Sequence, residues 1–198
     1  MSLLIESIKL LDGEFFNLSY HEQRMNRSLK ALCGTEDFFD LALFLEKCDN
    51  PVKGFFKCRI TYDDQVQDVE FLPYEAKPVQ SLKIVESDNI EYEFKYKDRS
   101  KIDKLFKRRD GCDDILIVKD DLVTDSSYSN VVFRKGTKWI TPWSALLKGT
   151  MRQSLIEQNL IQEEDIRVED IRDFDSCRII NAMLGFDAQE IDVKNIVF

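Results

Sequence analysis

The sequence has little of several residue types that mark common classes of small protein. Seven glycines and four prolines in 198 residues exclude a collagen-like or low-complexity chain. The five cysteines are far apart, form no CxxC pair and are accompanied by one histidine, which argues against a structural zinc site. No stretch reaches the roughly 18 apolar residues of a membrane span, and the start MSLLIESIKL lacks the basic region of a secretory signal. We therefore expect no metal and no membrane span, and free thiols in a reducing cytoplasm.

Positive charge is also scarce. The 37 Asp and Glu residues outnumber the 28 Lys and Arg residues, which gives a formal net charge of -9. Because a nucleic-acid partner needs a positive face, this balance argues against one. A small anionic ligand needs only a few N–H groups and one or two cations, so it stays compatible with the composition. The 43% of hydrophobic residues are enough for a buried core in one domain or two.

Two hairpins are expected in the first 75 residues. Asp12-Gly13 lies between apolar runs and predicts a hairpin over 3–18, because this pair favours a tight turn. Alternating apolar and polar residues predict a second hairpin over 54–74. The polar stretch 75–78 follows, and we interpret it as a linker between two domains.

Helix signals lie between the hairpins. Ser19 and Glu22 form a capping box that predicts a helix ending before Gly34, and a second helix is expected over 36–48. In the rest of the chain we expect strands at 82–85, 114–119, 131–134 and 178–184, and helices at 100–108, 151–158 and 163–168. This irregular order, without a GxGxxG or GxxxxGK[ST] sequence, predicts an α+β fold rather than a nucleotide-binding doubly wound sheet.

Four segments combine chemically active side chains with positions at element ends: HEQRMNRS, FKYKDRS, VTDSSYSN and PWSALLKGTMR. Their order resembles the signature of the class IV aminotransferases, the fold-type IV enzymes that use pyridoxal 5'-phosphate (PLP). That family includes branched-chain and D-amino-acid aminotransferases and 4-amino-4-deoxychorismate lyases. The resemblance covers nearly the whole chain. It implies a two-domain fold like that of D-amino-acid aminotransferase, with a small α/β domain over 1–76 and a larger, β-rich cofactor-binding domain over 77–198.

The first segments resemble the family's "ETI" strand and its H-x-x-R-[LM]-x-x-S helix, here Glu6-Ser7-Ile8 and residues 21–28. The match implies that Arg24 binds the cofactor phosphate, because a planar fork of donors suits a dianion. We expect His21, one turn earlier on the same face, to pack or hydrogen-bond behind it rather than to catalyse.

The resemblance implies that a lysine in FKYKDRS forms a bond with the cofactor. Lys95 aligns best with the family's Schiff-base lysine, because it precedes Arg99 by four residues. Lys97 is the alternative, since strand alternation gives both lysines the same phase. The residue must lose a proton to attack an aldehyde and then act as a base, and a neighbouring cation or partial burial favours this.

The last two segments resemble the family's V-T-E-x-x-x-x-N-[IV] motif and its phosphate loop. The first match implies that Asp125, one methylene shorter than the usual Glu, holds the pyridine nitrogen protonated, with Asn130 also in the cofactor site. The alternative is a turn capped by Asp and Ser side chains. The second match implies that Gly149 lets the phosphate approach, with Thr150 and Met151 as N–H donors at a helix start. Met151 replaces a common Thr and removes a hydroxyl contact.

The resemblance leaves the reaction open. It implies a small amino substrate and leans toward 4-amino-4-deoxychorismate lyase, which releases pyruvate and 4-aminobenzoate, over an amino-acid aminotransferase. Arg59 is the candidate for binding the substrate carboxylate, and a surface cation is the alternative. A homodimer is implied as well. A third reading, from a different class, is a non-catalytic scaffold with a decayed cofactor site.

Overall fold

The computed structural model describes residues 2–34 and 37–198, and the chain divides into two compact units. The first contains 1–76 together with 94–98, and the second contains 77–93 together with 99–198. The division after residue 76 coincides with the predicted linker. The segment 94–98 does not follow the prediction, because it joins the first unit although the sequence places it inside the second.

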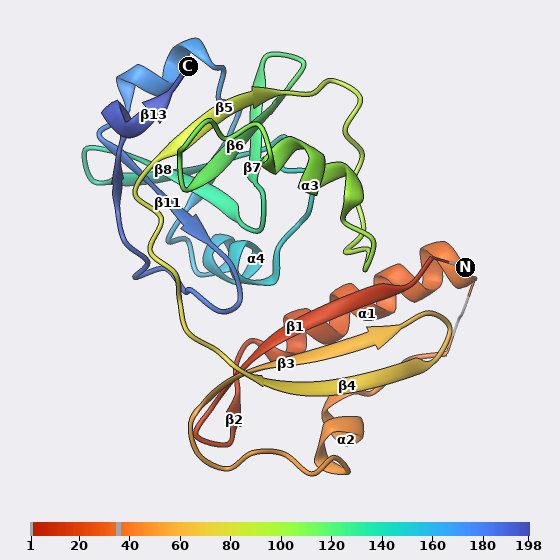
Figure 1. Ribbon diagram of the computed structural model, residues 1–198. Coiled ribbons are helices and arrows are strands. Elements are labelled where there is room, and N and C mark those ends of the chain that lie inside the picture. The colour runs from red at the N-terminus through yellow and green to blue at the C-terminus, as the bar shows by residue number, and fades with distance from the viewer. Residues whose placement is uncertain (1, 35–36) are drawn as a thin grey trace. The chain divides into compact units, whose positions relative to one another are not determined.

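The first unit is a four-stranded antiparallel sheet in the order β2-β1-β3-β4. Its elements are β1 (Leu4–Leu11), β2 (Glu14–Phe15), α1 (Leu18–Cys33), α2 (Leu41–Glu46), β3 (Phe55–Tyr62) and β4 (Val66–Pro73). Both predicted hairpins form. Helix α1 runs along one face of the sheet (Figure 1), and Met25 and Leu29 of α1 pack on Ile8, Cys58 and Ile60.

The helix starts differ from the sequence-based expectation. Helix α1 begins at Leu18 after Asn17, which has a φ of 54°, a left-handed conformation that Asn tolerates better than most residues. The predicted capping box is therefore wrong, and Glu22 instead accepts a hydrogen bond from Leu41 N at 2.8 Å. Helix α2 is shorter than predicted because Asp40 caps it. Glu36, where the second helix was expected to begin, lies outside the described residues.

The second unit is built on a nine-stranded sheet with the path β10-β9-β8-β7-β6-β5-β13, and β11 pairs with β8 and β12. Its strands are β5 (Leu82–Glu86), β6 (Asp114–Lys119), β7 (Leu122–Ser126), β8 (Asn130–Lys135), β9 (Lys138–Pro142), β10 (Gln162–Glu164), β11 (Ser176–Ile180), β12 (Ile191–Asp192) and β13 (Ile196–Val197). The helices are α3 (Ser100–Phe106) and α4 (Thr150–Glu157), with 3-10 turns at Glu169–Asp173 and Val193–Asn195. Leu116, Val131, Phe133 and Cys177 are fully buried in its core. The α+β prediction is confirmed.

Two element predictions in this unit are wrong. The expected helix at 163–168 is instead strand β10, which pairs in parallel with β9 and precedes a 3-10 turn. Strand β11 ends at Ile180 rather than near 184, because Ile180 faces Asn130, where its partner β8 begins. Strands β7, β9, β12 and β13 were not predicted.

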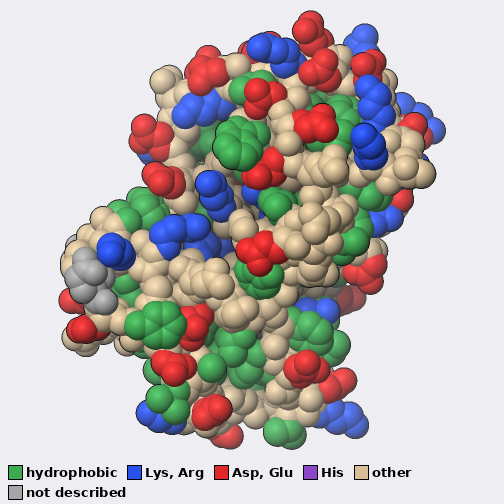
Figure 2. Space-filling model, turned by 180° about the vertical axis from the view of Figure 1, so that it is seen from behind, with side chains coloured by type: hydrophobic (Ala, Val, Ile, Leu, Met, Phe, Trp, Pro, Cys, Tyr) green, Lys and Arg blue, Asp and Glu red, His purple; other side chains and the backbone are tan. Residues whose placement is uncertain are grey.

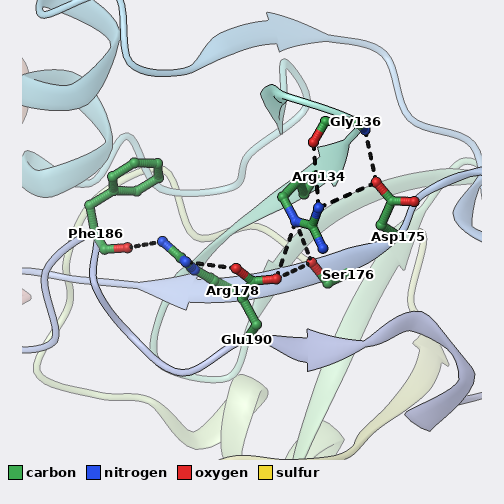
Figure 3. Close-up of polar contacts among 7 residues, drawn as sticks. All are labelled: Arg134, Gly136, Asp175, Ser176, Arg178, Phe186 and Glu190. Carbon is green, nitrogen blue, oxygen red and sulfur yellow. Dashed lines mark hydrogen bonds and ion pairs between the residues drawn. The ribbon is translucent and has the colours of Figure 1, made fainter.

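A polar network fixes the chain that returns to β12 (Figure 3). Glu190 accepts hydrogen bonds from Ser176 Oγ at 2.7 Å and Arg134 Nε at 3.2 Å. Its other oxygen accepts one from Arg178 Nη2 at 2.7 Å, and Arg178 Nη1 donates to Phe186 O at 2.7 Å. The network thus ties residues 186–190 to β8 and β11.

Surface composition agrees with the acidic sequence. Acidic side chains are spread over the face shown in Figure 2, and no histidine is visible because His21 is fully buried. Within the described residues, no group of His, Cys, Asp and Glu is arranged to hold a metal. None of the helices in that part of the chain has the length and apolar character needed to cross a membrane. Cys48, Cys58, Cys112 and Cys177 are thiols that take part in no disulfide.

Candidate active site

In the first unit a buried carboxylate organises two basic side chains. Glu6 lies on the α1 face of β1 and is fully buried. It accepts hydrogen bonds from Arg24 Nε at 2.9 Å and Arg24 Nη2 at 2.5 Å, and His21 Nδ1 lies 2.7 Å from Glu6 Oε2. His21 and Arg24 are one turn apart on α1, so both reach the same carboxylate.

The charges in this cluster follow from its contacts. Burial alone would raise the pKa of Glu6, but the Arg24 guanidinium and the His21 ring lower it to about 2, so Glu6 is ionised. Burial lowers the pKa of His21, although Glu6 opposes the effect. Because an ionised Glu6 can only accept, a neutral His21 donates its Nδ1–H. This hydrogen bond agrees with the predicted supporting role of His21.

Arg24, the predicted phosphate ligand, is held in one orientation. The two nitrogens that contact Glu6 fix the plane of its guanidinium, and the side chain is only 7% exposed. From the sequence Glu6 is named only as part of a strand motif, and its contact with Arg24 is not predicted. The available signal was an acid on the same strand face as the apolar residues Leu4 and Ile8.

The segment that contains the candidate lysines pairs with β1. Tyr96 forms a bridge with Leu4, and Ile5 N donates to Lys95 O at 2.9 Å. Lys95 is partly buried, whereas Lys97 is exposed. Lys95 is also close enough to lower the pKa of His21 through its positive charge. These differences favour Lys95 over Lys97 as the reactive lysine.

Arg59 lies apart from the Glu6 cluster. On β3 the neighbouring Cys58 and Ile60 point into the core beneath α1, so alternation places Arg59 on the other face of the sheet. Its Nε is 4.0 Å from a carboxylate oxygen of Glu70 on β4. The predicted contact of Arg59 with a substrate stays a prediction.

In the second unit Asp125 and Asn130 face each other across β7 and β8. They are paired residues of the two strands, and both side chains are buried. Asp125 accepts hydrogen bonds from Asn130 Nδ2 at 2.7 Å and Leu147 N at 3.0 Å. Burial raises the pKa of Asp125 to about 6, although these donors oppose the rise. Because Leu147 is 22 residues away in the chain, Asp125 does more than cap a local turn.

The predicted phosphate loop leads into α4. Gly149 precedes the helix, and Thr150 and Met151 form its first turn, where N–H groups point outward from the helix start. Thr150 is buried and Met151 is partly buried. A Cβ on Gly149 would overlap Asn130 Oδ1. The structure thus brings Asp125, Asn130 and the start of α4 together.

Two further arginines anchor parts of this unit, and neither role was predicted from the sequence. Arg152 is 2% exposed and donates to Glu163 Oε1 at 2.6 Å and Pro142 O at 2.9 Å. Arg99 donates to Ser127 O at 2.5 Å, two residues after Asp125, and its guanidinium lies 4.0 Å from the ring centroid of Tyr128. Arg152 holds α4 to β9, and Arg99 holds the turn between β7 and β8.

Each unit therefore carries its own set of chemically active groups. The first supplies an amine at Lys95 and an oriented cation at Arg24. The second supplies a buried acid and a helix start with close backbone access. The groups of the first unit suit an aldehyde and an anion, and those of the second unit suit a basic ring nitrogen and a phosphate.

Comparisons with known proteins agree with this chemistry. A family model described as amino-transferase class IV matches residues 94–188. An uncharacterised protein from Haemophilus influenzae is 39% identical over 184 residues, which cover 92% of this chain and 98% of that protein. A crystal structure of a candidate 4-amino-4-deoxychorismate lyase from Haemophilus somnus is 36% identical, with a TM-score of 0.89 over 94% of this chain and 98% of that chain. A hypothetical aminotransferase from Mycobacterium tuberculosis, in its PLP-bound form, shares the fold at 18% identity and a TM-score of 0.76, over 96% of this chain and 80% of its own.

Proposed function

Since the chain belongs to the class IV aminotransferase family, we propose that it is an enzyme that binds PLP through Lys95 and acts on a small amino compound. The observation that carries the proposal is Asp125. A carboxylate buried in the second unit, hydrogen-bonded to a backbone N–H and an amide, matches the acid that a pyridine nitrogen requires. Retention of Lys95, Arg24 and Gly149 in the same chain supports it.

The residues present fit the cofactor. Arg24, oriented by Glu6, and the N–H groups of Thr150 and Met151 are suited to a phosphate dianion. Asp125 is suited to a protonated ring nitrogen, because a positive neighbour favours its ionised form. PLP, when bound, supplies the electron sink that makes the substrate's α-proton acidic.

Lys95 performs the proton transfer in this proposal. With the cofactor bound, Lys95 Nζ would be the base that removes the α-proton of the substrate. Lys95 is partly buried and lies near the Glu6 cluster, where its positive charge lowers the pKa of His21. Lys97 is exposed and lacks this environment.

The first experiment tests cofactor binding. Purified protein is incubated with PLP, reduced with borohydride and mapped by mass spectrometry, with Lys95→Ala and Lys97→Ala as a matched pair. We expect a pyridoxyl label on Lys95 in the wild type and in Lys97→Ala, and none in Lys95→Ala. Protein that takes up no PLP would favour the scaffold with a decayed site.

For the reaction we propose a 4-amino-4-deoxychorismate lyase, which releases pyruvate and 4-aminobenzoate as in folate biosynthesis. The 36% identical candidate lyase, matched over 98% of its length, supports this choice. The second candidate is an amino-acid aminotransferase, favoured by the aminotransferase family model. Pyruvate formed in equal amount to 4-aminobenzoate supports the lyase, whereas a keto acid formed only with an added amino acceptor supports the aminotransferase.

The proposed enzyme is a cytoplasmic homodimer. The thiol state of Cys48, Cys58, Cys112 and Cys177 supports a reducing compartment. Sedimentation velocity at several concentrations tests the dimer, and a monomer of 23.2 kDa at all of them would contradict it.

A further inference from the structure

The side-chain amide of Asn130 joins two parts of the second unit. Its Nδ2 donates to Asp125 Oδ1 at 2.7 Å and to Leu147 O at 2.8 Å. Leu147 N donates in turn to Asp125 Oδ2 at 3.0 Å. The three residues thus form a closed ring of hydrogen bonds in which both amide hydrogens of Asn130 are used.

The side-chain amide of Asn130 also explains why residue 149 is a glycine. The φ of -70° and ψ of 147° of Gly149 are ordinary for any L-residue, so the backbone does not require glycine. A Cβ at this position would instead overlap Asn130 Oδ1, and its next side-chain neighbour would be Arg152 Cβ at an ordinary 3.9 Å. Glycine is needed there because Asn130 occupies the space.

We propose that Asn130 is a positioning residue that holds the Asp125 carboxylate and the loop entering α4 in one fixed arrangement, with Gly149 present to make room for its amide. Asn130 acts through its neighbours, which refines the sequence-based assignment of Asn130 to cofactor binding. The consequence for the cofactor site rests on the proposed function, whereas the arrangement itself is a property of the apo-protein.

The first test needs no cofactor. The titration of Asp125 is followed by carboxyl NMR in apo-protein labelled with 13C-aspartate, for the wild type, Asn130→Ala and Thr124→Val, with Asp125→Asn used to assign the signal. Thr124 is the matched control, because it is buried next to Asp125 but donates to Ile117 O. We expect the Asp125 midpoint to rise further in Asn130→Ala, which loses a donor to the charged form, and to stay unchanged in Thr124→Val. An unchanged midpoint in Asn130→Ala would overturn the proposal.

The second test is a double-mutant cycle with Asn130→Ala and Gly149→Ala. Each single change is expected to weaken PLP binding about 10-fold or more, because each breaks the hydrogen-bonded ring. The double variant should bind no worse than the weaker single variant, since Gly149→Ala has nothing left to displace. If the fold-losses in PLP binding of the two single variants multiply in the double variant, the proposal is contradicted. The same cycle is measured in thermal unfolding of the apo-protein, so a chain that binds no PLP would refute the proposed function and leave the role of Asn130 testable.

Discussion

Glu6 and Asp125 show how the surroundings of a buried carboxylate decide its charge. Both are almost completely buried, which alone raises the pKa of an acid. Glu6 contacts Arg24 and His21, and its pKa falls to about 2. Asp125 contacts uncharged N–H donors, and its pKa rises to about 6. The first acid therefore stabilises a cation within the protein, while the second is suited to a positive group from outside.

The raised pKa of Asp125 predicts a pH-dependent stability. The folded apo-protein holds this proton more tightly than the unfolded chain, so the stabilisation is complete below the usual pKa of 3.8 and is lost as pH rises through 6. The difference corresponds to about 3 kcal/mol. In urea unfolding from pH 4 to 7.5, Asp125→Asn should gain stability relative to the wild type by up to about that amount. A difference that stays constant with pH would contradict the raised pKa.

Loss of the Glu6 carboxylate should be far more damaging than loss of a surface partner. Glu6→Gln removes the charge that balances a buried Arg24, and we expect a loss of about 3–5 kcal/mol in the free energy of unfolding. Glu70→Gln is the control, because its pair with Arg59 is long and solvent-accessible, and it should cost less than about 1 kcal/mol. Equal losses in urea denaturation would show that the Glu6 cluster is not the stronger one.

The motifs predict individual residues better than their partners. Arg24, Lys95 and Asp125 are named from sequence because each belongs to a spaced pattern. The contact of Glu6 with His21 and Arg24 spans 15 and 18 residues, and the contact of Asp125 with Leu147 spans 22. Such separations are set by strand pairing and helix packing, which local pattern does not determine.

At the scale of elements, local signals succeed where neighbours in sequence decide the structure. The Asp12-Gly13 turn forms between β1 and β2, and Gly34 ends α1 in the left-handed conformation. Strand β10 shows the opposite case. Its charged sequence resembles a helix surface, but pairing with β9, about 20 residues earlier in the chain, makes it a strand.

The network around Glu190 predicts a local rather than a global effect. Glu190 is 36% exposed, so Glu190→Gln should cost less than about 1 kcal/mol of stability. However, the hydrogen bonds of Glu190 to Arg134, Ser176 and Arg178 hold residues 186–190 in place. In Glu190→Gln the backbone amide hydrogens of residues 186–190 should therefore exchange faster with solvent. Asp187→Asn, an exposed change in the same segment, is the control. Exchange that is equal in both variants would remove the network's role.

At the scale of the whole molecule, the sequence predicts the linker but not the path of 94–98. Composition changes at 75–78, and this is visible locally. The pairing of Tyr96 with Leu4 joins residues 92 positions apart, and no periodicity in either segment specifies it. As a consequence, the candidate lysine belongs to the first unit, although the chain before residue 94 and after residue 98 belongs to the second.

Two cysteines, one in each core, make this connectivity testable. Cys58 lies in the first unit and Cys177 in the second; both are fully buried, and burial raises the pKa of each to about 12. Because thiolate is the reactive form, neither should react with dithionitrobenzoate at pH 8 in the native protein. In increasing urea we expect both cysteines to become reactive over the same concentration range. The reason is that the segment 94–98, which pairs with β1 in the first unit, is joined at both of its ends to the second unit. Mass mapping identifies the labelled residue, and labelling of Cys58 at a clearly lower urea concentration than Cys177 would mean that the first unit opens while the second stays folded.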